Sequence, residues 1–145
     1  MNGMTIIVKK VSQLLSGLIF MYGIYIITHG HLTPGGGFAG GAIIAGAFIF
    51  LILAYGSRVI SLHKEETKTT LTESLALLLI ILLAGTGIWV GSMVFFNNYL
   101  PEGKVGELIS AGLIPIYNIL IGIEVSAALL TIFLALVIFK EEVST

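Results

Sequence analysis

The sequence contains no cysteine and no aspartate, and only 10% of its 145 residues are charged. The missing cysteine excludes disulfides, thiolate zinc sites, iron–sulfur ligation and thiol nucleophiles. Soluble domains carry about 25% charged residues, so a water-soluble globule fits this chain poorly. The 7 basic and 8 acidic side chains nearly balance, which leaves no electrostatic footprint for nucleic-acid binding. With a mean hydropathy of +1.06, the chain is predicted to be a small integral membrane protein.

Charges are also absent from long internal stretches. No Asp, Glu, Lys or Arg occurs between Lys10 and Arg58 or between Glu73 and Glu102. A spanning helix needs about 20 mostly apolar residues. Four such runs are present, at 8–28, 38–59, 74–97 and 112–139. Barrel strands would alternate in polarity, whereas helices satisfy their own backbone in lipid. We therefore predict an all-α integral membrane protein with four transmembrane helices, forming a single membrane domain over 1–145.

The basic residues predict an orientation. On the side of the termini and the second connector lie Lys9, Lys10, Arg58, Lys64, Lys68 and Lys140, whereas the opposite side has only Lys104. Because cytoplasmic loops are enriched in Lys and Arg, this distribution predicts cytoplasmic N- and C-termini in a multi-pass plasma-membrane protein. A cleaved signal peptide fits the N-terminus less well, since the first apolar run is long and no Ala-x-Ala site follows it.

Two connectors have ordinary explanations. Segment 61–70 is hydrophilic and mixed in charge, which is typical of a solvated connector. The Thr70-Leu71-Thr72-Glu73 run matches a capping box, so Glu73 is predicted to be a helix-start carboxylate. Segment 97–106 contains Pro101 and two glycines, which indicate a turn region on the other side of the membrane.

The joint between the first two apolar runs is unusual. It reads Thr28-His29-Gly30-His31-Leu32-Thr33-Pro34-Gly35-Gly36-Gly37-Phe38-Ala39-Gly40-Gly41. Glycine relaxes the limits on φ, and proline fixes φ and lacks an amide donor. This composition predicts a tight turn that starts a helix at about Gly36. Small residues at a spacing of four favour close approach of helix backbones in lipid, and they are Gly36/Gly40 and Gly37/Gly41/Ala45.

Other uses of this joint compete with close packing. A glycine-rich turn before a helix can bind phosphate, but there is no Walker lysine and no full dinucleotide pattern. The His29-x-His31 pair could ligate a metal, yet a real site needs three or four ligands, so no metal site and no cofactor are expected. A histidine that titrates beside an ion path is a further alternative for His31.

Glu124 is the only Asp, Glu, Lys or Arg between Leu108 and Phe139. A charge in the middle of a spanning helix costs about 2.5–3.5 kcal/mol on insertion scales, so it normally faces protein or water. At helical spacing it shares a face with Tyr117, Ile121, Ala127, Ala128 and Thr131. Two interpretations remain open: Glu124 lines a proton or cation route, or it hydrogen-bonds and pins two helices together.

The joint resembles a family signature. Its residues match the Gly-His-x-x-Pro-Gly-Gly-Gly-Phe-x-Gly-Gly pattern of the MnhB/MrpB-like family of Mrp-type Na⁺/H⁺ antiporter subunits. The defining positions are Gly30, His31, Pro34, Gly35, Gly36, Gly37, Phe38, Gly40 and Gly41. The segment Ile114–Val125, the length and the four spans also look like that family, so the resemblance covers essentially the whole chain.

The resemblance implies a non-catalytic subunit of a multi-subunit cation/proton antiporter, working with other antiporter subunits in the lipid bilayer. Similar subunits occur in archaeal membrane-bound hydrogenase and sulfane reductase complexes, where redox chemistry drives sodium export. In such assemblies larger subunits carry the main relay residues, and Na⁺ and H⁺ are the transported ions. Apart from Lys9 and Lys10 at the edge of the first span, no lysine lies inside the four spans, which agrees with that division of labour.

Two further hypotheses stay open beside this one. The chain could be a purely structural assembly subunit with no ion contact. It could also be a self-sufficient transporter similar to small multidrug exporters, which have four spans and one buried glutamate. Those exporters carry the acid in the first span, whereas Glu124 lies in the fourth.

Overall fold

The computed structural model describes residues 4–56, 62–92, 94–104, 106–107 and 110–143. Their regular elements are α1 (Ile6–Thr28), α2 (Gly36–Tyr55), α3 (Leu62–Gly87), the π-helical turn η2 (Ile88–Ser92) and α4 (Ile114–Val143). All of these are helical, and four helices are long and apolar enough to cross a membrane. The predicted all-α, four-span fold class is therefore confirmed.

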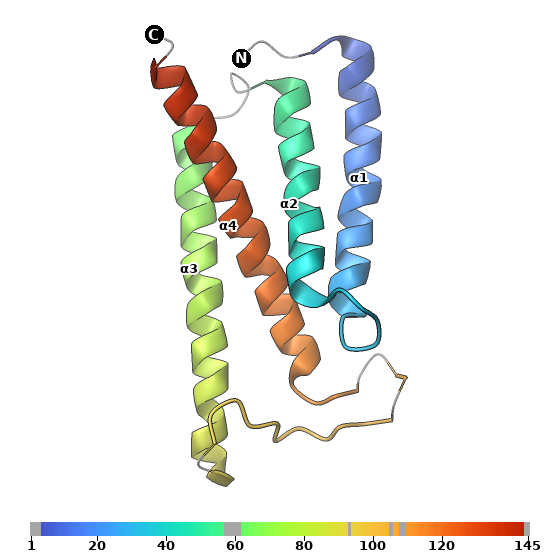
Figure 1. The fold of residues 1–145 in the computed structure, drawn as a ribbon, viewed down its shortest axis with the longest axis vertical. Coiled ribbons are helices and arrows are strands. Elements are labelled where there is room, and N and C mark those ends of the chain that lie inside the picture. Colours follow the sequence, from blue (N-terminus) through green and yellow to red (C-terminus); the bar gives the residue numbers. More distant parts are fainter. Residues whose placement is uncertain (1–3, 57–61, 93, 105, 108–109, 144–145) are drawn as a thin grey trace.

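Helix α4 is the central element of the bundle. It runs at a tilt between α3 on one side and α2 on the other, and α1 lies on the outer side of α2 (Figure 1). The start of α1 and the end of α4 lie at one end of the bundle, and the α1–α2 joint lies at the other end (Figure 1). Both ends of the described chain therefore lie on the same side of the bundle, as the distribution of basic residues predicts. That this side is cytoplasmic is a prediction from those residues.

Most of the outer surface is apolar. Between 17% and 33% of the best apolar window of each helix is buried inside the chain. Large apolar side chains are correspondingly exposed on every helix, and Trp89 in η2 is 94% exposed. Water-soluble proteins rarely expose continuous apolar surfaces of this extent. Lipid or the apolar sides of other subunits must therefore cover the bundle.

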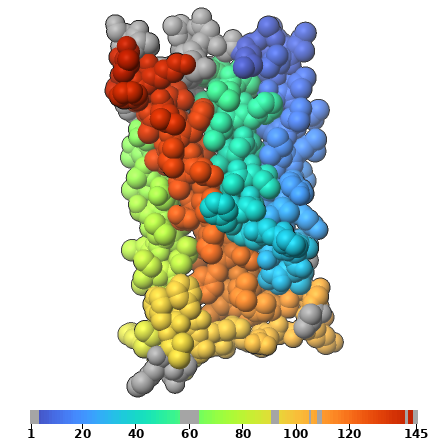
Figure 2. Space-filling model, in the orientation of Figure 1, coloured from blue at the N-terminus to red at the C-terminus, as the bar shows by residue number. Residues whose placement is uncertain are grey.

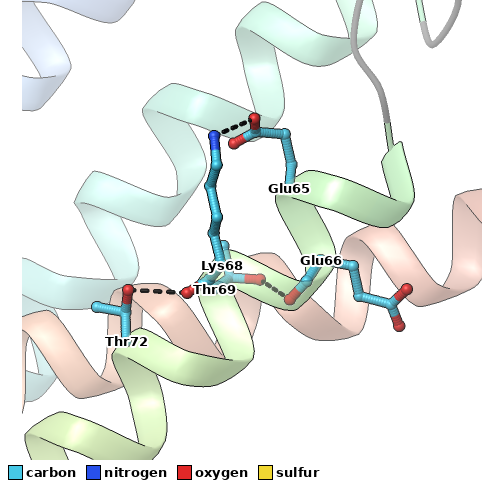
Figure 3. Close-up of polar contacts among 5 residues, drawn as sticks. All are labelled: Glu65, Glu66, Lys68, Thr69 and Thr72. Carbon is cyan, nitrogen blue, oxygen red and sulfur yellow. Dashed lines mark hydrogen bonds and ion pairs between the residues drawn. The ribbon is translucent and has the colours of Figure 1, made fainter.

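The predicted connector at 61–70 is wrong in its described part, because α3 begins at Leu62. The polar side chains there serve the helix itself (Figure 3). Lys68 pairs with Glu65 at 2.7 Å, and the hydroxyl of Thr70 donates to the Glu66 carbonyl at 2.9 Å. The capping box is therefore wrong too, since Thr70 lies inside the helix. Polar residues that bond within their own helix extend α3 beyond its apolar part.

The third predicted span, 74–97, ends too late. The α-helix stops at Gly87, and η2 continues it only to Ser92. The chain then folds back, with Phe96 at a φ of +62° and its N–H donating to the Ala84 carbonyl at 3.2 Å. A Cβ on Gly87 would lie 2.9 Å from the amide nitrogen of Asn97. The bare backbone of Gly87 thus lets apolar residues at 94–97 turn back against α3.

The bounds of the other spans differ by a few residues from prediction. Helix α1 begins at Ile6, before the predicted residue 8. Helix α2 runs from Gly36 to Tyr55, and Gly56 ends it with a φ of +84°; the predicted residues 57–59 lie outside the described part. Helix α4 begins at Ile114 and continues to Val143.

The described parts of the connection between η2 and α4 form a layer across the joint end of the bundle (Figure 2). Asn98 holds this layer to α4, because its Oδ1 accepts the N–H of Leu113 at 3.0 Å. The layer also reaches the α1–α2 joint, as the contact of His31 described below shows.

Candidate functional site

The α1–α2 joint begins with a histidine that serves the end of α1. The His29 ring stacks on Tyr25 with centroids 4.1 Å apart, and its Nδ1 lies 3.0 Å from the Tyr25 carbonyl oxygen. The His29 carbonyl accepts the N–H of Thr33 at 2.9 Å. His29 is therefore engaged in local structure.

The turn itself depends on glycines. Gly35 and Gly36 have φ values of +138° and +69°, which L side chains rarely adopt. Gly30 lies so close to Gly36 that a Cβ on Gly30 would overlap the Gly36 Cα. The prediction that a tight turn starts a helix at about Gly36 is confirmed, since α2 begins there.

The glycines at the start of α2 face two different helices. A Cβ on Gly37 would lie 2.5 Å from the Asn118 carbonyl oxygen, and one on Gly41 would lie 2.6 Å from the Gly122 carbonyl oxygen. Both contacts are with α4. Gly40 instead faces α1, where a Cβ would overlap the side chain of Ile27. The joint thus brings α1, α2 and α4 together through bare backbone.

Two other residues of the predicted motif point outward. Phe38 is 68% exposed, and Pro34 is exposed beside the turn. Within this chain they do not take part in the helix packing, so any packing role for Phe38 would be against lipid or another subunit.

Two glycines on the opposing helices escape prediction from the sequence. A Cβ on Gly23 in α1 would lie 2.6 Å from Ile44, and one on Gly122 in α4 would overlap Ile27. Both are therefore as constrained as the glycines of the joint. The sequence offers only a weak signal, the helical spacing of Ser12, Ser16, Gly23 and Ile27, which the structure buries on one face of α1. That spacing does not identify the helix that lies opposite.

Asn118 connects α4 to the joint. Its Oδ1 accepts the N–H of Gly37 at 3.4 Å. Its Nδ2 lies beside Gly30, 2.9 Å from the position that a Gly30 Cβ would take. From the helical periodicity of α4, the sequence shows only that Asn118 lies off the Glu124 face. Its contact with the joint depends on how α4 packs against α2, which the sequence does not show.

His31 points into the layer that closes this end of the bundle. Its Nε2 lies 3.4 Å from the Glu107 carbonyl oxygen, and its side chain is half-buried. His31 and His29 thus have different partners. No group of three or more His, Cys, Asp or Glu side chains suited to a metal occurs among the described residues.

Glu124 is half-buried near the middle of α4. Two turns away on either side along the same helix face lie Tyr117 and Thr131. The Tyr117 ring packs at 5.4 Å from Phe96, and the Thr131 hydroxyl bonds to Thr69 of α3 at 2.8 Å. Glu124 therefore lies on the α3-facing side of α4. No hydrogen bond or ion pair of its carboxylate joins it to another described residue.

The two ion-route candidates are not brought together. His31 lies at the joint end, level with the first turns of α4 that contact Gly30 and Gly37. Glu124 lies about 9 Å further along α4 than Asn118, from the rise of a helix. They are too far apart for direct proton transfer, so a proton passing between them would need intervening groups.

Comparison with known proteins decides the family. A model described as a domain related to the MnhB subunit of Na⁺/H⁺ antiporters matches residues 7–131, which is most of the chain. The chain belongs to the MnhB family. The resemblance seen in the joint is therefore confirmed, and the chain is a multi-pass membrane protein of this family.

Several relatives of this MnhB-family chain are known. An uncharacterized protein of Methanocaldococcus jannaschii, MJ1307, is 38% identical over 134 residues, covering 88% of this chain and 50% of that protein. The B-type Na⁺/H⁺ antiporter subunit of Bacillus subtilis is 33% identical over 101 residues, covering 66% of this chain and 62% of that protein.

A solved structure shares the fold. One chain of the membrane-bound sulfane sulfur reductase, an archaeal respiratory membrane complex, matches with a TM-score of 0.72 and 32% identity. The match covers 89% of this chain and 56% of that chain. This MnhB-family chain therefore spans only part of the length of each of these relatives.

Proposed function

We propose that this MnhB-family chain is a non-catalytic membrane subunit of a multi-subunit Mrp-type Na⁺/H⁺ antiporter module. The family match over residues 7–131 supports this function. Its apolar, largely exposed helices also suit a subunit that packs against larger membrane partners. The sulfane sulfur reductase likeness supports a second setting, in which the same module works inside a redox-driven complex.

Glu124 lines a cation or proton route in this proposal. The observation that carries it is a half-buried carboxylate on α4 without a partner among the described residues of its own chain. An intramembrane carboxylate is expensive to insert and commonly marks an ion pathway. Since no lysine or arginine lies in the apolar part of any span, the groups that complete the route belong to neighbouring subunits.

His31 is the second candidate on this route. Its imidazole lies at the joint end of the bundle, with Nε2 near the Glu107 carbonyl. An imidazole can accept a proton on one nitrogen while the other keeps its hydrogen bond. That chemistry suits a proton-exchanging group at the membrane boundary.

The test is Na⁺/H⁺ exchange in vesicles that contain the whole host complex. Glu124→Gln keeps the size of the side chain and removes its charge, so exchange should be lost while the complex still assembles. Glu102→Gln is the matched control, because the same change falls on an exposed carboxylate in the connecting layer. Normal exchange by assembled Glu124→Gln complexes would remove Glu124 from the route.

A purely structural role is the alternative. The close backbone contacts of Gly37 and Gly41 with α4 favour it, because they serve packing alone. Under this alternative Glu124→Gln and His31→Ala complexes would exchange ions normally, and only changes that disturb packing would reduce activity.

A further inference from the structure

Three side-chain polar atoms are buried without a hydrogen-bond partner among the described residues. They are His31 Nδ1, Tyr117 Oη and Asn118 Nδ2. Folded proteins leave few such atoms unpaired, and each one in a native structure calls for a bound water, an ion or another group. All three belong to residues at the joint end of the bundle.

The segments that carry these atoms adjoin each other. Gly30, next to His31 in the chain, has its Cβ position 2.9 Å from Asn118 Nδ2. Tyr117 precedes Asn118 in the second turn of α4. The three atoms thus come from the joint and from the stretch of α4 that packs against it.

The chemistry of the set is mixed. Asn118 Nδ2 is a donor only, because Oδ1 is the atom that accepts the Gly37 N–H. With Nε2 of His31 donating to the Glu107 carbonyl, Nδ1 of the same ring is an acceptor. The Tyr117 hydroxyl can do both.

This mixture selects the ligand. A metal cation needs acceptors and would be repelled by the Asn118 amide hydrogens, whereas an anion needs donors and would be repelled by the His31 lone pair. Water donates and accepts, and buried waters typically make about three hydrogen bonds to otherwise unpaired polar groups. We propose that the His31, Tyr117 and Asn118 side chains bind ordered water at the joint end of the bundle.

The position of Tyr117 gives this water a role in ion movement. Tyr117 lies on the same face of α4 as Glu124, two turns closer to the joint. Water bound to the Tyr117 hydroxyl lies on this face and forms the joint-side end of the route whose middle is Glu124. The role in transport rests on the proposed function, whereas the water site itself stands on the unpaired atoms.

The first test uses the unaltered host complex. A structure at a resolution that shows ordered solvent should contain water within about 2.7–3.2 Å of at least two of the three atoms. Absence of that density would overturn the site. Direct hydrogen bonds from these atoms to a polar group of a neighbouring chain would overturn it as well.

The second test is Tyr117→Phe, which removes one hydroxyl and keeps the ring against Phe96. If the hydroxyl is truly unpaired, its removal relieves a desolvation penalty and raises the Tm of the complex. If it binds water, its removal leaves the other groups short of a partner and lowers the Tm. Tyr22→Phe on the exposed side of α1 is the control and should leave the Tm unchanged. A raised Tm for Tyr117→Phe counts against the site.

The transport role is tested separately. Exchange by the Tyr117→Phe complex should fall about two- to tenfold, the rate equivalent of one lost hydrogen bond. Unchanged exchange would overturn this role of the water. If no water is found near the three atoms and Glu124→Gln complexes are still inactive, only this inference fails. If Glu124→Gln complexes exchange ions normally, the proposed route fails and the water site stands.

Discussion

The hydroxyl of Thr131 donates a hydrogen bond to the hydroxyl of Thr69 across 2.8 Å, which joins α4 to α3. Thr69 in turn donates to the Glu66 carbonyl at 2.9 Å (Figure 3), so the two hydroxyls form a short chain. The pair fixes the register of the two antiparallel helices. Two turns toward the bundle centre from each threonine, Glu124 on α4 comes level with the buried Ala76 on α3. A small residue thus stands opposite the carboxylate.

We expect this threonine pair to contribute measurably to the packing of α3 on α4. Interhelical hydrogen bonds in membrane proteins average about 0.6 kcal/mol in double-mutant cycles. Thr69→Val and Thr131→Val should show a coupling of that size in the free energy of unfolding. Thr72→Val is the control, because its hydroxyl bonds only to the Lys68 carbonyl in its own helix. Strictly additive effects of the two substitutions would contradict the prediction.

Alanine at the glycines facing α4 should destabilise the protein. A Cβ at Gly37 or Gly41 would meet backbone oxygens of α4 at 2.5 and 2.6 Å, and overpacking of this kind costs about 1–3 kcal/mol. Thermal unfolding and recovery of assembled complex measure the loss. Leucine at either position should abolish assembly.

Two glycines provide a matched control. Gly46 in α2 and Gly85 in α3 would place a Cβ with nothing within 4 Å. Gly46→Ala and Gly85→Ala should be neutral or stabilising, because alanine favours a helix by up to about 1 kcal/mol. Equal losses at Gly41 and Gly46 would show that the joint glycines are not special.

The predicted features of this fold are those that lipid imposes. Each of the four apolar runs contains most of a helix because a buried backbone must bond to itself. The turn before Gly36 follows from positive φ values that L side chains rarely adopt. The contacts of Gly23, Gly122 and Asn118 could not be predicted, since they depend on which helix lies opposite. The predicted start of α3 is wrong because Thr70 resembles a cap in sequence, whereas its hydroxyl bonds to the preceding turn.

Asn98 should be required for the start of α4 through its oxygen alone. Its Oδ1 accepts the Leu113 N–H at 3.0 Å, one of the amides that no helical carbonyl can satisfy. Asn98→Asp keeps an acceptor and should be tolerated, whereas Asn98→Leu should lose about 1 kcal/mol of stability, as for a lost cap. Denaturation of the two variants side by side checks this. A larger loss for Asn98→Asp than for Asn98→Leu would exclude the capping role.

Alanine substitutions of the two histidines of the joint should have different effects on ion exchange. The His29 ring stacks on Tyr25 and bonds within the last turn of α1, so His29→Ala should lower stability slightly and leave ion exchange by assembled complexes unchanged. His31 instead reaches the Glu107 carbonyl across the end of the bundle, and His31→Ala removes a group that can carry a proton there. We expect exchange to fall in His31→Ala complexes whose assembly and Tm match those of His29→Ala. Equal exchange by the two variants would place His31 off the route and leave Glu124 as its only candidate in this chain.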